Sequence, residues 1–340
     1  MKKTVKKKKE ILIIALLAVL LLALCMVSFA LGRYPVSLKK LFGIIFSVFG
    51  SGEKYWDERD VVIILNLRLP RILAACMAGS CLSAAGACFQ GIFRNPMASP
   101  EILGASKGAA FGAALAIILG LAKPAVTLSA FLFSLLSIAA VFFCGRKVRG
   151  NALFGLILAG IMVGSLFDAG TSFIKLAADP NDQLPAITYW MIGSLSGVTL
   201  RDISFAAVPM LIGIIPLLLL RWKLNLLTME DEEAMSAGVN IRKLRLGVLF
   251  CATLITAASV AMSGVISWVG LVMPHLMRRL VGSNNRFLIP ACIFGGALFL
   301  LATDNLSRTL MSTEIPIGIL TAVVGAPFFL FLLSAGRDSR

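Results

Sequence analysis

The chain has 340 residues, of which 59% are hydrophobic and only 14% are charged. Its mean hydropathy is +0.93 and its formal net charge is +15. A soluble domain carries roughly 25% charged residues, so this chain has too few charges to cover a surface in contact with water. The composition excludes a cytosolic enzyme, a nucleic-acid-binding domain and a disordered tail. It predicts an all-α polytopic membrane protein, because helices satisfy their own backbone hydrogen bonds inside the hydrocarbon.

The chain begins with a basic segment, residues 1–10, which reads MKKTVKKKKE. Residues 11–31 follow without a single charged side chain. An uncharged stretch of this length exceeds the hydrophobic region of an ordinary signal peptide. We therefore predict a retained first membrane-spanning helix.

Later apolar stretches are also long enough to span a bilayer, which needs about 20 residues. One further stretch, 246–277, carries no formal charge and would reach about 48 Å as one helix, well beyond the ~30 Å core. We predict two short helices there, broken near Ser263 and Gly264. With these two, the count is ten spans within a single domain, residues 11–335. The other spans are 72–93, 102–121, 124–145, 152–178, 203–220, 287–303 and 315–335.

The distribution of basic residues orients the ten spans. Twenty of the 32 Lys and Arg residues lie in segments on the side of the N-terminus, eleven lie on the other side, and Lys107 lies within a span. Because basic loops remain in the cytoplasm, both termini are predicted to be cytoplasmic, including the tail 336–340. Residues 227–245 then form a cytoplasmic loop, in which Gly238 suits the end of a short helix. The apolar segment 187–197 is external and is predicted to form a short helix that dips into the membrane.

No motif for catalysis or metal binding is apparent. The sequence has no GxxxxGK[ST] phosphate-binding loop, and its only histidine is His275. Its seven cysteines contain no CxxC pair and lie in or beside apolar runs, which predicts thiols packed between helices. We expect no enzyme, no bound metal and no cofactor held by this chain.

The second predicted span has small residues at four-residue steps, Gly79, Ser83 and Ala87. Such a face allows close helix packing, and a lining of the transport pathway is the alternative. Asp168 lies within the fifth predicted span, where a carboxylate is a candidate pathway residue by default. Local hydrogen bonds to Thr171 and Ser172 are an equal alternative for Asp168.

Three arginines lie at the outer ends of predicted spans. Arg68 and Arg71 flank Pro70, and Arg308 follows Asp304 by four residues. One interpretation is contact with lipid headgroups or a surface ion pair. The other is an exposed basic rim that binds an acidic partner.

Taken together, four stretches resemble the permease subunit of iron-siderophore, haem and vitamin B12 importers, a FecCD-like (type II) branch of the ATP-binding-cassette transporters. These stretches are 68–112, 189–197, 264–290 and 304–333, and their order and spacing match the family across nearly the whole chain. The resemblance implies ten helices per subunit and a half-channel that pairs with a second permease subunit, identical or closely related. It also implies two separate ATPase subunits that use ATP and Mg, an extracellular or periplasmic binding protein, and a place in the bacterial cell (inner) membrane.

The resemblance also implies roles for particular residues. The cytoplasmic loop matches the family's coupling helices, which contact the ATPase, and Glu233, Ala234 and Gly238 fall on their pattern. Asn95 and Met97 fall in the turn that resembles the cytoplasmic gate. By the same resemblance, residues Arg68, Arg71 and Arg308 would dock the binding protein.

Three positions depart from the family pattern. Lys107 stands where a small residue is usual, Ala237 replaces a leucine, and Asn284-Asn285 replaces Asp-His. Because of these departures, the resemblance does not specify which residues contact the ATPase or line the pathway near these positions.

The sequence leaves the cargo open. An iron(III)-siderophore chelate is expected, with haem or cobalamin as alternatives within the same family. An ion-gradient-driven secondary transporter is an alternative of another class, and it would need intramembrane charges near the midplane, for which Asp168 is the main candidate. A membrane enzyme is a third alternative, against which the absence of a catalytic constellation argues.

Overall fold

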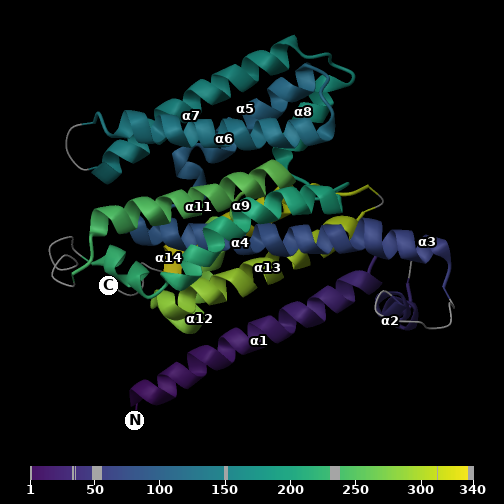
Figure 1. The fold of residues 1–340 in the computed structure, drawn as a ribbon, viewed down its shortest axis with the longest axis horizontal. Coiled ribbons are helices and arrows are strands. Elements are labelled where there is room, and N and C mark those ends of the chain that lie inside the picture. Colours follow the sequence, from purple (N-terminus) through teal and green to yellow (C-terminus); the bar gives the residue numbers. More distant parts are fainter. Residues whose placement is uncertain are drawn as a thin grey trace.

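The computed structural model describes residues 2–32, 34, 36–47, 56–148, 152–229, 238–311 and 313–335. Every regular element in these ranges is a helix, so the predicted all-α class is confirmed. The helices run roughly parallel to the long axis of the molecule, and the N-terminus of α1 lies at the left end (Figure 1). The elements are α1 (Lys2–Ala30), α2 (Leu38–Ser47), α3 (Glu58–Val61), a π-helical segment (Val62–Arg68), α4 (Leu69–Ile92), a 3-10 helix (Pro100–Leu103), α5 (Ala105–Ile118), α6 (Lys123–Gly145), α7 (Ala152–Ala177), α8 (Gln183–Ile192), α9 (Leu200–Leu219), a second 3-10 helix (Lys223–Thr228), α11 (Ile241–Ser263), α12 (Val269–Val281), α13 (Asn285–Thr309) and α14 (Ile317–Ala335).

Within the described residues, seven helical stretches are long and apolar enough to cross a membrane. The chain is therefore an integral membrane protein. The other three predicted spans correspond to the shorter helices α5, α12 and α14, so the count of ten remains a prediction. The seven stretches are Lys7–Ala30, Glu58–Ile92, Lys123–Gly145, Leu153–Ala177, Leu200–Leu219, Ile241–Ser263 and Asn285–Thr309.

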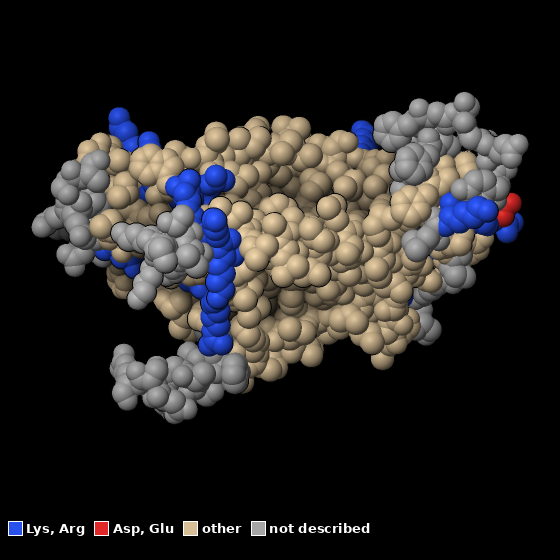
Figure 2. Space-filling model, turned by 90° about the horizontal axis from the view of Figure 1, so that it is seen from below, with Lys and Arg blue, Asp and Glu red and all other residues tan. Residues whose placement is uncertain are grey.

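Charged side chains are concentrated at the two ends of the molecule in the face drawn in Figure 2. A broad belt between the ends of this face shows almost none. The belt is the surface expected of helices that lie across a hydrocarbon layer, and its flanking lysines and arginines lie where they reach water or headgroups.

The predicted break between the seventh and eighth helices is confirmed. Helix α11 ends at Ser263, Gly264 has a φ of +70°, and α12 begins at Val269. A Cβ atom on residue 264 would lie 2.3 Å from the backbone oxygen of Trp190. Only glycine satisfies both the left-handed backbone and this close approach.

Two predicted boundaries differ from the structure. The span predicted at 102–121 is split, because Gly104 adopts a φ of +73° between the 3-10 helix and α5. The external helix predicted within 187–197 begins earlier and ends at Ile192, because Gly193 has a φ of +81°. In both cases a glycine with positive φ ends a helix within an apolar run. The hydropathy of the run alone would have predicted that the helix continues.

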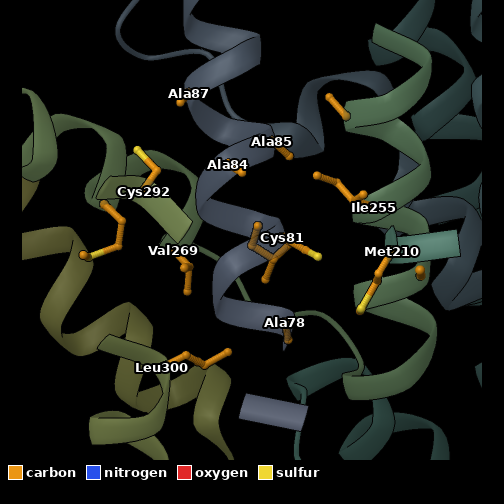
Figure 3. Close-up of a cluster of buried hydrophobic side chains, with 14 of the residues drawn as sticks. Ala78, Cys81, Ala84, Ala85, Ala87, Met210, Ile255, Val269, Cys292 and Leu300 are labelled. Carbon is orange, nitrogen blue, oxygen red and sulfur yellow. The ribbon is translucent and has the colours of Figure 1, made fainter. Parts of the chain in front are cut away.

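Helix α4 lies at the centre of the bundle and packs through small side chains. In Figure 3 its alanines and Cys81 lie between Met210 and Ile255 on one side and Val269 and Leu300 on the other. These contacts come from α9 and α11 on the first side and from α12 and α13 on the second.

Two glycine contacts on α4 require the absence of a side chain. A Cβ on Gly79 would lie 2.3 Å from the backbone oxygen of Gly296, and a Cβ on Gly86 would lie 1.8 Å from that of Gly270. Ser83, which is 0% exposed, also packs against Gly296. Close packing is therefore the role of Gly79 and Ser83, in preference to lining a pathway.

Candidate functional site

The three predicted docking arginines lie at the end of the bundle where α4 begins, and they are largely buried. Arg68 is 6% exposed and donates hydrogen bonds to the backbone oxygens of Phe29 and Tyr34. Arg308 is 7% exposed and donates to the backbone oxygen of Ser28 at 2.7 Å. Both side chains therefore fasten the end of α1 to the neighbouring helices.

Arg71 joins two acidic side chains at the same end. Its Nε lies 2.8 Å from Asp304, and its Nη1 lies 2.9 Å from Glu314. Asp304 is fully buried and also lies 3.8 Å from Arg308 Nε. The network joins α4, α13 and the segment that leads into α14.

These contacts correct one expectation from the sequence. Asp304 and Arg308 do form an ion pair, but the pair is buried rather than on the surface, since Asp304 is 0% exposed. Within the described residues, exposed arginines at this end are Arg59 and Arg201. The docking role of the three buried arginines stays a prediction.

A second ion pair holds the short helices α2 and α3 together. Lys40 Nζ of α2 lies 2.7 Å from Asp60 of α3. The hydrogen bond to Asp60 raises the pKa of Lys40 above its ordinary value, so the ammonium form persists at any physiological pH. The π-helical segment after α3 runs directly into α4, so the helical run Glu58–Ile92 extends about 50 Å, further than a bilayer core.

At the opposite end, the turn between α4 and the first 3-10 helix presents the two predicted gate residues. Asn95 and Met97 are both exposed, Met97 by 51%. The Asn95 side chain accepts a hydrogen bond from the Met97 backbone N–H at 2.9 Å, and this bond closes the turn. Whether the pair narrows a pathway remains a prediction, because that role involves a second subunit.

This turn is bonded to the beginning of the loop 227–245. The Arg94 guanidinium donates to the backbone oxygen of Leu227 at 3.3 Å and also to that of Met229. Arg94 itself has a φ of +48°, a conformation that is uncommon outside glycine. The sequence did not predict this contact. Every residue has a backbone oxygen, so no residue type or spacing indicates which one Arg94 will bind.

Of the three predicted coupling residues, Glu233 and Ala234 lie outside the described residues. Gly238 has a φ of +73°, and a Cβ atom added to it would meet no other atom within 4 Å. Its positive φ agrees with the predicted helix-terminating position. The coupling role of all three residues remains a prediction.

The unusual Asn284-Asn285 pair forms a contact at the same end of the molecule. The Asn225 amide donates to Asn284 Oδ1 at 3.1 Å, and Asn225 Oδ1 accepts from the Asn285 backbone N–H at 2.8 Å. Asn284 also caps α13 by accepting from the Arg286 N–H. The second 3-10 helix is thereby fixed to the start of α13.

In the middle of the molecule, Asp168 of α7 forms an ion pair with Lys107 of α5. Their side chains approach to 2.7 Å and are 54% and 43% exposed, respectively. The expected local alternative is wrong: Thr171 and Ser172 donate to the backbone oxygens of Phe167 and Asp168, not to the carboxylate. A single charge at the centre of a bilayer costs about 2.5–3.5 kcal/mol on insertion scales, so a paired arrangement is favoured.

No metal site is found among the described residues, where no three His, Cys, Asp or Glu side chains come together. The seven cysteines are free thiols, and the sulfurs of Cys25 and Cys76 lie 3.9 Å apart. A cavity of about 720 Å³ opens near the end of α5, the start of α6 and the end of α11, with Lys123 and Trp190 among its lining residues. The described residues therefore form a helical membrane unit with its polar contacts at the two ends and one charged pair at mid-depth.

The described residues thus form a bundle of apolar helices with one broken helix, a turn bonded to the start of the loop 227–245, and an ion pair midway along α7. Residues 20–335 match the model of the FecCD transport family. The chain belongs to this family and is a permease of an ABC importer.

Similar proteins include permeases of other bacterial importers. The molybdate import system permease protein MolB of Haemophilus influenzae is 39% identical over 92% of each chain. The hemin transport system permease protein HmuU of Yersinia pestis is 36% identical over 97% of each chain. A solved structure described as a metal-chelate type ABC transporter in an inward-facing conformation is 37% identical, covers 96% of this chain and 99% of its own, and has a TM-score of 0.84.

Proposed function

We propose that this chain is the permease of an ATP-driven importer that passes an iron(III)-siderophore-type chelate from an extracellular binding protein to the cytoplasm. The proposal is carried by the family match over residues 20–335 together with the bonded connection between the turn at Arg94 and the loop at Leu227. Haem or cobalamin are alternative cargoes. The relatives named for molybdate and hemin support importers of this kind for more than one cargo.

The proposed topology has ten crossings with both termini in the cytoplasm. The crossings are α1, α4, α5, α6, α7, α9, α11, α12, α13 and α14. The excess of basic residues on the side of the N-terminus supports this orientation. It places the turn 93–99 and the loop 227–245 on the cytoplasmic side, and it places the arginine network on the outside.

In the proposed assembly, two permease subunits, identical or closely related, enclose the route, and two ATPases bind beneath them. ATP binding draws the ATPases together and moves the loop 227–245 through Glu233 and Ala234. Arg94 transmits this movement to the turn that carries Asn95 and Met97, where the cytoplasmic gate opens. This sequence is alternating access between two packed states.

We propose docking of the binding protein at the outer end, near Arg68, Arg71 and Arg308. Support comes from the common position of the three arginines at one end of the bundle, where Arg71 and Arg308 share the carboxylate of Asp304. Affinity for the binding protein should fall steeply with ionic strength. An affinity that is insensitive to salt would reject this surface.

The test of coupling is the variant Glu233→Lys in the assembled transporter. It replaces the acidic side chain that is proposed to contact the ATPase with a basic one. We expect uptake to fall while ATP hydrolysis continues. Full uptake by this variant would remove the loop from the mechanism. The cargo is identified separately, by the thermal shift of the cognate binding protein with ferric siderophore, haemin and cyanocobalamin.

A further inference from the structure

One side of α7 carries a stripe of polar residues, Ser165, Asp168, Ser172 and Lys175. Their spacing of three, four and three residues places them along one face of a helix. Ser165, Asp168 and Ser172 are exposed. The stripe therefore forms a continuous polar surface from the middle of α7 toward its outer end.

The remaining exposed surface of α7 is strongly apolar. Met162, Leu166, Phe173 and Leu176 are between 69% and 85% exposed and lie on the adjoining face of the helix. This second face suits lipid or an apolar protein surface. The two faces of one helix therefore meet different surroundings.

If α7 spans the membrane, the ion pair lies within the hydrocarbon layer. Asp168 is 16 residues after the start of α7 and nine before its end, which is about 24 Å and 14 Å along the axis. The Lys107 ammonium is held at this depth by its 2.7 Å contact with Asp168. Neither side chain extends to an interface as a snorkelling residue does.

The structure provides space for the Lys107 side chain. A Cβ on Gly164 would lie 2.7 Å from Lys107 Cδ, so the glycine allows the aliphatic stem to lie across α7. Yet the two charged ends remain about half exposed. A charged pair that is neither buried nor near a headgroup must face water or a polar partner, because lipid would leave its remaining hydrogen bonds unmade.

We propose that this polar stripe, with Lys107, forms a wall of a water-filled cargo route at half-depth, and that the wall favours anionic, oxygen-rich cargo. The inference rests on the proposed importer function and specifies the cargo's charge. The wall carries two ammonium groups, Lys107 and Lys175, and one carboxylate, Asp168, so it is net cationic. Because Asp168 already neutralises part of the charge, the contact with a passing carboxylate or oxyanion is weak, and cargo is released onward.

Water access is tested first, in the assembled transporter during ATP turnover. Ser165→Cys and its neighbour Leu166→Cys lie at the same depth on the two faces, and both native residues are exposed. A charged, membrane-impermeant methanethiosulfonate is applied from both sides, with the wild-type cysteines as background. Because only a hydrated thiolate reacts, labelling of residue 165 is expected to be about tenfold faster. Equal or slower labelling of residue 165 would overturn the water-filled wall.

The charge preference is tested with the double variant Lys107→Gln/Asp168→Asn. Uptake of haemin, ferric citrate and molybdate is measured, with neutral cyanocobalamin as a comparison. The uptake rate of an anion imported by the wild type is expected to fall about tenfold, whereas Lys147→Gln, which removes an exposed lysine at the end of α6, keeps the wild-type rate. An undiminished anion rate in the double variant, or a wild type that imports cyanocobalamin alone, would overturn the preference.

The two proposals fail in different ways. If the wild type imports neither these probes nor a ferric siderophore with ATP and the cognate binding protein, the proposed function fails, while the labelling contrast between residues 165 and 166 still decides the water-filled wall. If import proceeds and the contrast is absent, only the wall is rejected.

Discussion

The guanidinium of Arg94 lies 3.3 Å from the backbone oxygen of Leu227, and this hydrogen bond joins the turn that holds Asn95 and Met97 to the beginning of the loop 227–245. The two segments are far apart in the chain and make contact at one end of the bundle. Leu227 is 2% exposed and belongs to the same buried cluster as Ala84 and Ala85 of α4, so the start of the loop is packed on the core as well as bonded to the turn. In the proposed mechanism, a displacement of the loop reaches the turn through Arg94 and through this packing.

Removing the Arg94 side chain should uncouple hydrolysis from import. The informative variant is Arg94→Gly, since glycine accepts the φ of +48° found there and removes only the side chain. We expect fewer cargo molecules imported per ATP hydrolysed. Arg146→Gly, at an exposed arginine in the turn after α6, is the matched control, and an equal ratio in both variants would contradict the role of Arg94.

The buried network of Arg71, Asp304 and Arg308 should contribute strongly to stability. Asp304→Ala leaves Arg71 and Arg308 without their shared carboxylate, which typically costs about 3–5 kcal/mol. Asp57→Ala removes the exposed N-cap carboxylate of α3, whose side chain is 78% exposed and 3.9 Å from Lys40, and should cost only about 1 kcal/mol. Thermal unfolding in detergent measures both. A Tm for the Asp304 variant equal to that of the Asp57 variant would show that the network is dispensable.

The close helix contact at Gly86 should not tolerate even one added carbon. A Cβ there would lie 1.8 Å from the backbone oxygen of Gly270, so Gly86→Ala must separate α4 from α12. We expect a loss of about 1–3 kcal/mol or more, the usual cost of overpacking. Gly247→Ala meets no atom within 4 Å and should be neutral or stabilising by up to about 1 kcal/mol. The ratio of folded to aggregated protein after heating distinguishes them, and equal ratios would argue against the packing of α4 on α12.

Much of the fold could be predicted, because hydropathy and the thickness of a bilayer constrain it. The stretch 246–277 is too long for one span, and the break at Ser263 and Gly264 follows from its length and from the glycine. The split at Gly104 could not be predicted in the same way. Hydropathy does not show which glycine in an apolar run will adopt a positive φ, and the small residues after Gly104 are equally compatible with a continuous helix.

The site was less predictable, because tertiary contacts decide what each charged side chain does. The partner of Asp168 is Lys107 on a different helix, and no local spacing relates them. Arg68 resembles an exposed basic group in the sequence, whereas its hydrogen-bond acceptors are the backbone oxygens of Phe29 and Tyr34. Backbone acceptors are present at every residue, so the sequence does not show which of them an arginine will use.

The most direct measurement is uptake into liposomes that contain this chain, its partner ATPases and its binding protein. The uptake of radiolabelled cargo is measured under three conditions. The side of the membrane that carries the ATPases receives ATP, a non-hydrolysable ATP analogue, or no nucleotide but a proton gradient. We predict uptake with ATP alone, and none with the analogue or with the gradient. Uptake that follows the proton gradient and ignores ATP would contradict the account and identify a secondary transporter instead.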